Sequence, residues 1–187
     1  MNPTSTSVPI PAIAGPMQLF NGDHGTPFLA PRGVCLTENH LIVADTGQNR
    51  VFIWNNRQHM ETHRRPDVVL GQSNTSGTAR NQGNAAGPAT LQYPSGIWSD
   101  GNLLLVADAW NHRVLIWRRM PLRSDQAADV VIGQPDFEAN QPNVSGLGKP
   151  PSARSLYWPY GVWSDGQRIW IADTGNRRAL YYENIPD

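Results

Sequence analysis

The segment VADTGQNRV at residues 43–51 recurs as VADAWNHRV at residues 106–114 and as IADTGNRR at residues 171–178. A Pro-x-Gly sequence precedes each copy, and its proline stands at the same distance before the aspartate every time, at Pro31, Pro94 and Pro159. The spacing between successive prolines is nearly the same as well. A nearly constant period of this kind is typical of a repeat architecture, in which each copy needs its neighbours to bury its apolar face.

Short apolar runs bounded by turn residues occupy each copy. In the first copy they lie at residues 34–36, 41–44, 51–54 and 68–70, and in the second at 96–98, 103–107, 114–117 and 130–132. Four runs of this length predict one four-stranded antiparallel sheet for each copy. No segment has a sustained apolar period of 3.6 residues, so we expect little helix. Repeated four-stranded sheets, or blades, predict an all-β fold of the β-propeller type.

The three segments and their Pro-x-Gly openings resemble NHL repeats, and the resemblance covers all three copies. It implies a propeller built from NHL-like four-stranded blades. One feature departs from that pattern, because each interval is roughly 20 residues longer than a propeller blade of ordinary length. Most of the additional residues fall in two long insertions, Ser73–Gln92 and Pro135–Leu156.

The predicted organisation is an N-terminal segment (1–27), two blades with long insertions (28–90 and 91–155) and a third blade without its fourth strand (156–187). Three blades do not close a ring, because propellers typically have four to eight. The stretch Val8–Gly15 precedes the first copy where a fourth strand would lie. We therefore predict a homodimer that forms a six-bladed ring, in which each N-terminal strand completes the last blade of the partner. A fragment of a longer propeller is the alternative.

Composition limits the classes of partner. The formal net charge is zero and the isoelectric point is near 7.0, which argues against nucleic acid and anionic membranes as partners. The N-terminus has no basic start followed by an apolar run, so we expect a cytoplasmic protein without a membrane span. Cys35 is the only cysteine, which excludes an intrachain disulfide, and we expect it to be a buried apolar thiol.

Residues that recur in every copy are predicted to serve the blade. Each copy has an aspartate at the end of its second strand and an arginine five positions later, across the same hairpin: Asp45 and Arg50, Asp108 and Arg113, and Asp173 and Arg178. An aspartate at this position can accept backbone hydrogen bonds, and a charge-assisted contact with the arginine would hold the turn.

Residues that differ between copies are the candidates for function. In a four-stranded blade, the link to the next blade and the turn between strands two and three lie on the same face, which also carries the residues around Pro-x-Gly. Both long insertions are therefore expected on this face, together with a mixed aromatic and basic set of candidate binding residues: Arg32, Tyr93, Trp110, His112, Trp158, Tyr160 and Arg177. Variable loops on a rigid scaffold are frequent binding sites. The alternative is that these loops cover neighbouring blades and bind nothing.

The motifs of common enzymes are absent from the sequence. It contains no P-loop, no Gly-x-Gly-x-x-Gly and no Gly-x-Ser-x-Gly. His59 and His63 have a spacing that permits zinc binding on a helix, but they lie in a predicted loop without a nearby third ligand, so we expect neither a metal site nor a cofactor.

The leading functional hypothesis is a non-catalytic binding or scaffold propeller that holds a protein, peptide or small-molecule ligand on its insertion-rich face. It follows from the resemblance, because NHL-like propellers are commonly interaction platforms. A propeller enzyme similar to peptidyl amidating lyases or strictosidine synthases, with its site at the channel mouth, is an alternative. Binding of single-stranded RNA by the arginines and aromatic rings is a second alternative, against which the neutral charge counts.

Overall fold

The chain folds into three antiparallel sheets in a computed structural model that describes residues 27–56 and 65–186. We call these sheets blades 1, 2 and 3. Blade 1 contains β1 (Gly33–Leu36), β2 (Leu41–Asp45), β3 (Arg50–Trp54) and β4 (Val68–Leu70). Blade 2 contains β5 (Pro94–Ser99), β6 (Leu104–Asp108), β7 (Arg113–Trp117) and β8 (Val130–Ile132). Blade 3 contains β9 (Pro159–Ser164), β10 (Ile169–Asp173) and β11 (Arg178–Tyr182).

The predicted all-β class and strand order are confirmed, and the sheets are consistent with blades of a β-propeller. Helical structure in the described residues is limited to short 3-10 turns: η1 (Thr46–Gln48), η2 (Arg80–Gly83), η3 (Ala109–Asn111) and η4 (Thr174–Asn176). The predicted N-terminal strand at Val8–Gly15 and the pair His59 and His63 lie outside the described residues.

The Pro-x-Gly openings of blades 2 and 3 are parts of strands β5 and β9. Pro94 begins β5 and pairs with Asp108, and Pro159 begins β9 and pairs with Asp173, with an irregularity in register next to each pair. Proline is tolerated at the first residue of a strand or beside a bulge, because its missing N–H is not needed there.

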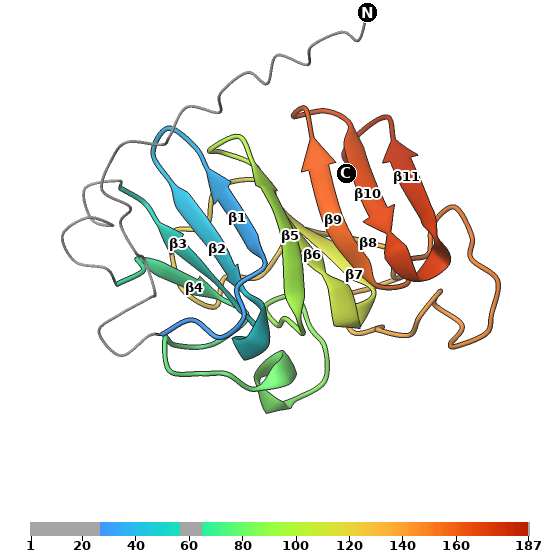
Figure 1. The fold of residues 1–187 in the computed structure, drawn as a ribbon, viewed down its shortest axis with the longest axis horizontal. Helices are drawn as coiled ribbons and strands as arrows, with labels where there is room; N and C mark the ends of the chain where they lie inside the picture. Colours follow the sequence, from blue (N-terminus) through green and yellow to red (C-terminus); the bar gives the residue numbers. More distant parts are fainter. Residues whose placement is uncertain (1–26, 57–64, 187) are drawn as a thin grey trace, which may run out of the picture.

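The blades stand side by side, with β1, β5 and β9 as neighbouring strands (Figure 1). Successive side chains of a strand point to opposite faces of the sheet, so each blade has two sets of side chains, one on each face. Ile42 and Ile53 of blade 1 pack with Leu104 and Leu115 of blade 2 in one apolar core. A second core lies between blades 2 and 3 and contains Leu105, Ile116, Ile169 and Ile171 among others.

Glycine permits the close approach of neighbouring first strands. A Cβ atom placed on Gly33 would lie 2.0 Å from the carbonyl oxygen of Ser95, which belongs to blade 2. One placed on Gly96 would lie 2.8 Å from the carbonyl oxygen of Tyr160, which belongs to blade 3. The glycine of Pro-x-Gly is thus required where the backbone of the next blade packs against it.

The predicted aspartate–arginine pairs form in all three blades. Arginine Nε donates to aspartate Oδ2 over 2.9 Å in blade 1 and 2.8 Å in blades 2 and 3. The other oxygen, Oδ1, accepts a backbone N–H from the segment before the blade, from Leu29, Gln92 and Tyr157 respectively. Each carboxylate therefore ties the hairpin of its blade to the segment that leads into it.

The remaining N–H groups of each arginine bind carbonyl oxygens of the long loops and, in the case of Arg50, also that of Pro27 before blade 1. Nη1 of Arg113 donates to Phe137 in the loop after blade 2, and Nη2 donates to Gly87 and Thr90 in the loop before it. Among the described loops, Arg178 binds the preceding one, at Ser152 and Ser155. Its side chain remains 26% exposed, whereas that of Arg113 is fully buried.

Because Arg113 is more buried and binds more of the described loops than Arg178, the same substitution should lower the free energy of unfolding by different amounts at the two positions. Arg113→Met leaves Asp108 as an unpaired buried charge and releases two loops, so we expect a loss of about 3–5 kcal/mol in the free energy of unfolding. Arg178→Met removes fewer contacts from a partly hydrated site, and we expect about 1–2 kcal/mol. Urea unfolding of both variants measures these losses. Equal losses would contradict the assignment of Arg113 as a two-loop clamp.

Candidate functional site

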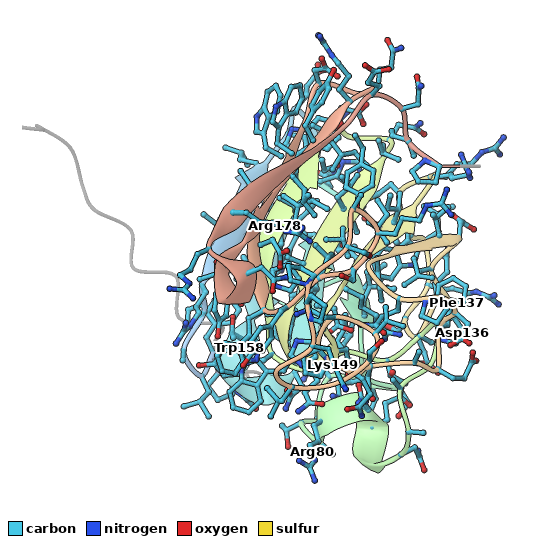
Figure 2. All side chains as sticks on the ribbon, turned by 90° about the vertical axis from the view of Figure 1, so that its right-hand side faces the viewer. Arg80, Asp136, Phe137, Lys149, Trp158 and Arg178 are labelled. Carbon is cyan, nitrogen blue, oxygen red and sulfur yellow. The ribbon has the colours of Figure 1, made fainter. Side chains whose placement is uncertain are left out.

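Both long insertions lie on the face that also carries η1, η3 and η4, as the sequence predicted (Figure 1). We call this surface the insertion-rich face. Figure 2 shows Arg80 of the first insertion, Lys149 of the second and Trp158 toward the same end of the molecule. The site is therefore built from segments of three blades and two loops.

A reciprocal pair of asparagine amides docks each insertion on a turn. Asn81 and Asn111 exchange two hydrogen bonds of 3.1 and 2.8 Å, and Asn143 and Asn176 exchange two of 3.0 and 2.8 Å. The turn asparagine of each pair also donates to the aspartate of its own hairpin, over 2.7 Å in both cases. The bases of the insertions are thus repeated structural units, and sequence reasoning missed them.

A signal for these pairs was present in the sequence. Asn81 stands at the same distance after Gly71 as Asn143 stands after Gly133. The glutamine after each glycine is also repeated, and its amide bridges the hairpin to the insertion. The bonds go from Gln72 to the carbonyl oxygens of Asn49 and Ala79, and from Gln134 to those of His112 and Gln141.

The side chain that ends each of the first two hairpin turns reaches across to the next blade. Oδ1 of Asn49 accepts a 2.9 Å bond from the backbone N–H of Tyr93, and Nδ1 of His112 accepts a 3.2 Å bond from that of Trp158. We call these two contacts the interblade clamps. Both acceptors have left-handed backbone, with φ of 55°, and so do Tyr93 (φ 57°) and Trp158 (φ 50°).

The first aromatic cluster lies at the junction of blades 1 and 2. The rings of Tyr93 and Trp110 stack with centroids 4.8 Å apart. The guanidinium of Arg32 lies 4.9 Å from the centroid of the Tyr93 ring and donates to its hydroxyl over 2.8 Å. Trp110 remains 44% exposed. Three predicted site residues therefore form one surface with an apolar plane and a cation.

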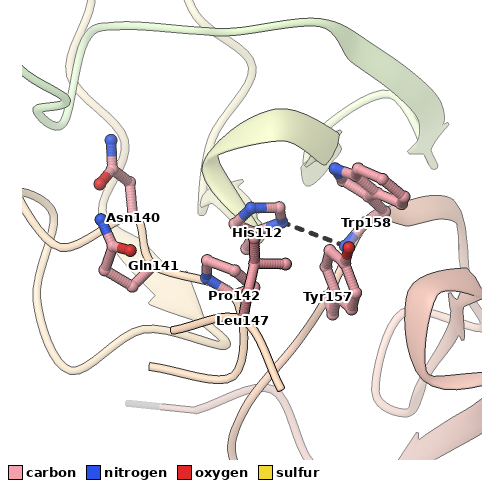
Figure 3. A pocket seen from close by; sticks show the side chains of 7 residues that line it. All are labelled: His112, Asn140, Gln141, Pro142, Leu147, Tyr157 and Trp158. Carbon is pink, nitrogen blue, oxygen red and sulfur yellow. Dashed lines mark hydrogen bonds between the residues drawn. The ribbon is translucent and has the colours of Figure 1, made fainter. Parts of the chain in front are cut away.

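The second aromatic cluster lies at the junction of blades 2 and 3. The rings of Tyr157 and Trp158 are 4.6 Å apart, and the His112 ring meets Tyr157 edge-on at 5.3 Å. These three residues line a hollow of about 410 Å³ with the tip of the second insertion (Figure 3). Sequence reasoning named His112 and Trp158 but missed the other lining residues: Asn140, Gln141, Pro142, Leu147 and Tyr157.

The last two predicted site residues stand apart from the clusters. Tyr160 lies within β9, and Arg177 is an exposed residue directly after η4. Among the described residues, neither side chain forms a hydrogen bond or ring contact with a member of either cluster. Their part in binding remains a prediction.

Burial keeps His112 neutral. It lowers the pKa of the imidazole to about 4, and the nearby charge of Asp173 opposes this effect. A neutral ring is what the clamp requires, because Nδ1 must carry a lone pair to accept the N–H of Trp158.

The described residues contain no group of three or more histidine, cysteine, aspartate or glutamate side chains able to hold a metal ion. None of the described helices is long and apolar enough to cross a membrane. The predicted buried thiol of Cys35 is half-buried, donates to the carbonyl oxygen of Ser99 over 3.7 Å and has its pKa raised by burial.

Sheets repeated in register and joined by the same hairpin and interblade contacts define a propeller-type repeat protein. The family model described as NHL repeat matches residues 28–54 and 91–117, which span the first three strands of blades 1 and 2. These matches identify the corresponding segments of blades 1 and 2 as NHL repeats. A search of the curated proteins finds no match to it.

The His112 clamp predicts an acid-dependent loss of stability. Because the folded pKa of about 4 lies below the ordinary value of 6.5, the unfolded chain binds more protons between these values. The contribution of neutral His112 is complete above pH 6.5 and declines as the pH falls toward 4. His112→Asn supplies the acceptor that Asn49 provides in the other clamp, without a titrating group.

We expect the wild type to lose about 2–3 kcal/mol more than His112→Asn between pH 7 and pH 4. Urea unfolding at both pH values measures the difference, in which the titration of all other groups cancels. Parallel losses in the two proteins would show that His112 is not held neutral by the fold.

Proposed function

We propose that this protein is a non-catalytic binding platform that holds a protein, peptide or small-molecule ligand on its insertion-rich face. The observation that carries the proposal is the pair of aromatic clusters at successive blade junctions, each presenting a partly exposed tryptophan. NHL repeats are commonly protein-interaction scaffolds, which agrees with this use of the face.

The backbone of Tyr93 and Trp158 has an unusual conformation that orients both aromatic rings. Tyr93 and Trp158 each precede a proline, a position that favours extended backbone, and yet both have left-handed φ values. A conformation of this kind costs about 1–3 kcal/mol in a bulky residue and persists only where its surroundings enforce it. Ala30 precedes Pro31 with a left-handed φ of 57°, so the conformation recurs in all three blades, and the interblade clamps fix it at Tyr93 and Trp158. They hold the aromatic rings in place before a ligand arrives.

Rigid aromatic surfaces make efficient anchors. A tyrosine or tryptophan offers a large contact area and loses little conformational entropy on binding, and less still when its backbone is already held. Trp110 is 44% and Trp158 is 37% exposed, so each ring is fixed on one side and free on the other. The hollow beside Trp158 is lined by rings, amides and aliphatic groups without an acidic or lysine side chain. We expect ligands with an aromatic or aliphatic group flanked by neutral hydrogen-bonding groups.

We also infer that the three blades are half of a six-bladed ring formed by two copies of the chain. Blades 1 and 2 each bury one face against the next blade, and the same arrangement continued through a second copy would close with cyclic symmetry. The insertion-rich faces of both copies would then surround one channel mouth.

A peptide selection tests the platform. Random peptides displayed on phage are selected on the wild type, and the affinity of the enriched peptides is measured by titration. We expect Trp110→Ala or Trp158→Ala to weaken binding at least tenfold, which corresponds to about 1.4 kcal/mol, because each removes an exposed anchor.

Leu122→Ala is the matched control, because Leu122 is 80% exposed in the loop after β7, away from both clusters. It is expected to change the affinity less than twofold. Peptides that tolerate the loss of both tryptophans would show that the ligand-binding surface lies elsewhere.

A further inference from the structure

Blade 3 carries an exposed aromatic row on the face turned away from blade 2. Trp163 of β9 is 53% exposed and Tyr181 of β11 is 49% exposed, and Trp170 of β10 lies between them. The ring centroids of Trp163 and Trp170 are 4.9 Å apart, and those of Trp170 and Tyr181 are 5.1 Å apart. We call these three residues the blade 3 row.

The same positions are covered in the other two blades. In blade 1, the residues equivalent to Trp170 and Tyr181 are Ile42 and Ile53. Both are completely buried in the core shared with blade 2. In blade 2 these positions are occupied by Leu105 and Ile116, which are completely buried in the core shared with blade 3. The blade 3 row therefore occupies the positions at which blades 1 and 2 receive the blade that follows them.

Gly161 favours a blade, rather than an arbitrary apolar partner, as the neighbour of this face. The equivalent glycines, Gly33 and Gly96, are needed because the first strand of the following blade lies on them. Within 4 Å, the one described atom that a Cβ on Gly161 would meet is the Cβ of Ala172 in its own blade, at 3.3 Å. The repeat nevertheless keeps a glycine here, which is what the backbone of an incoming first strand requires.

Thr174 provides an unused interblade hydrogen-bond donor. In blade 1, Oγ1 of the equivalent Thr46 is buried and donates over 2.6 Å to the carbonyl oxygen of Pro94, the first residue of β5. Oγ1 of Thr174 is directed to Ala172 of its own blade over 3.4 Å, and the residue is exposed. A following blade would bring a proline carbonyl oxygen to this hydroxyl.

The complementary surface is exposed at the other end of the same chain. Val34 and Leu36 of β1 are 69% and 64% exposed. The residues equivalent to Val34 in the other blades, Ile97 and Val162, each pack in the core shared with the preceding blade. Among the described residues, the first-strand surface of blade 1 and the receiving surface of blade 3 are thus both without a neighbouring blade.

We propose that the blade 3 row is the docking surface for β1 of a second copy of this chain, an inference that rests on the six-bladed ring proposed above. Gly161 would receive the backbone of the partner's first strand, and the Thr174 hydroxyl would donate to the carbonyl oxygen of the proline that opens the partner's first blade, the counterpart of Pro94. Two such interfaces related by a twofold axis close the ring.

Sedimentation of the purified 187-residue chain at micromolar concentration tests the interface. We expect a mass of twice 20.7 kDa for the wild type. Trp163→Arg and Val34→Arg are each expected to give a single-chain mass, because each places a charge on one side of the same contact. Leu122→Arg is the matched control and should leave the mass doubled. A single-chain mass for the wild type overturns the proposal.

Two variants separate this arrangement from others. A pairing of two blade 3 rows face to face would leave Val34→Arg dimeric, and that result overturns the assignment of β1. Gly161→Ala makes a tight contact with the Cβ of Ala172, at 3.3 Å, which a small shift of the exposed Ala172 can relieve. We therefore expect an unchanged near-ultraviolet dichroism spectrum and at least a tenfold rise in the dimer dissociation constant. An unchanged dissociation constant contradicts the proposed strand contact.

Peptide binding by the single-chain variant distinguishes this proposal from the binding platform. Both aromatic clusters lie at junctions within one chain, so Val34→Arg should bind the peptides selected on the wild type within threefold of its affinity. Peptide binding that is retained by a single chain supports the proposed binding platform, even if the proposed docking of β1 on blade 3 is wrong. Loss of binding by Trp110→Ala in a protein that stays dimeric, conversely, supports the platform independently.

Discussion

The buried contact between aspartate and arginine at the second hairpin organises each blade and the loops beside it. Both charges are removed from water at a cost that their attraction alone does not cover, so the pair is stable only with all its hydrogen bonds made. The carboxylate accepts backbone and asparagine N–H groups, and the guanidinium binds carbonyl oxygens of the long loops. The ion pair thereby converts a local turn into the anchor of the insertion-rich face.

The clamps and the aromatic clusters depend on that anchor in turn. Once the 3-10 turn is fixed, the residue that follows it is held in the left-handed region, and its side chain points to the next blade. Asn49 and His112 then hold Tyr93 and Trp158. Arg177 follows the third turn with the same backbone but offers only donors, so the junction beyond blade 3 has no side-chain acceptor of this kind at that position. A junction formed there would rely on sheet packing and on the proposed hydrogen bond from the Thr174 hydroxyl.

The repetition in the sequence was sufficient to predict the strands, the ion pairs and the face that gathers the loops, because all three follow from residues at constant spacing. The backbone at Tyr93 and Trp158 was not predictable, since the residue before a proline normally indicates extended structure. The neutral state of His112 depends on burial and on the N–H group of a residue far along the chain. The asparagine pairs could have been predicted from the sequence, because Asn81 and Asn143 stand at the same distance after a repeated glycine.

The reciprocal asparagine pairs have a consequence for how such a surface can diversify. Each amide pair, with the glutamine before it, secures the base of an insertion to the hairpin of its own blade or the next. Residues between the fixed points, such as 145–148 at the tip of the second insertion, lie outside these contacts and are largely exposed. The sequence of each insertion between these contacts can therefore change without a change in the blades. New recognition surfaces can be introduced there while the contacts at the base are kept.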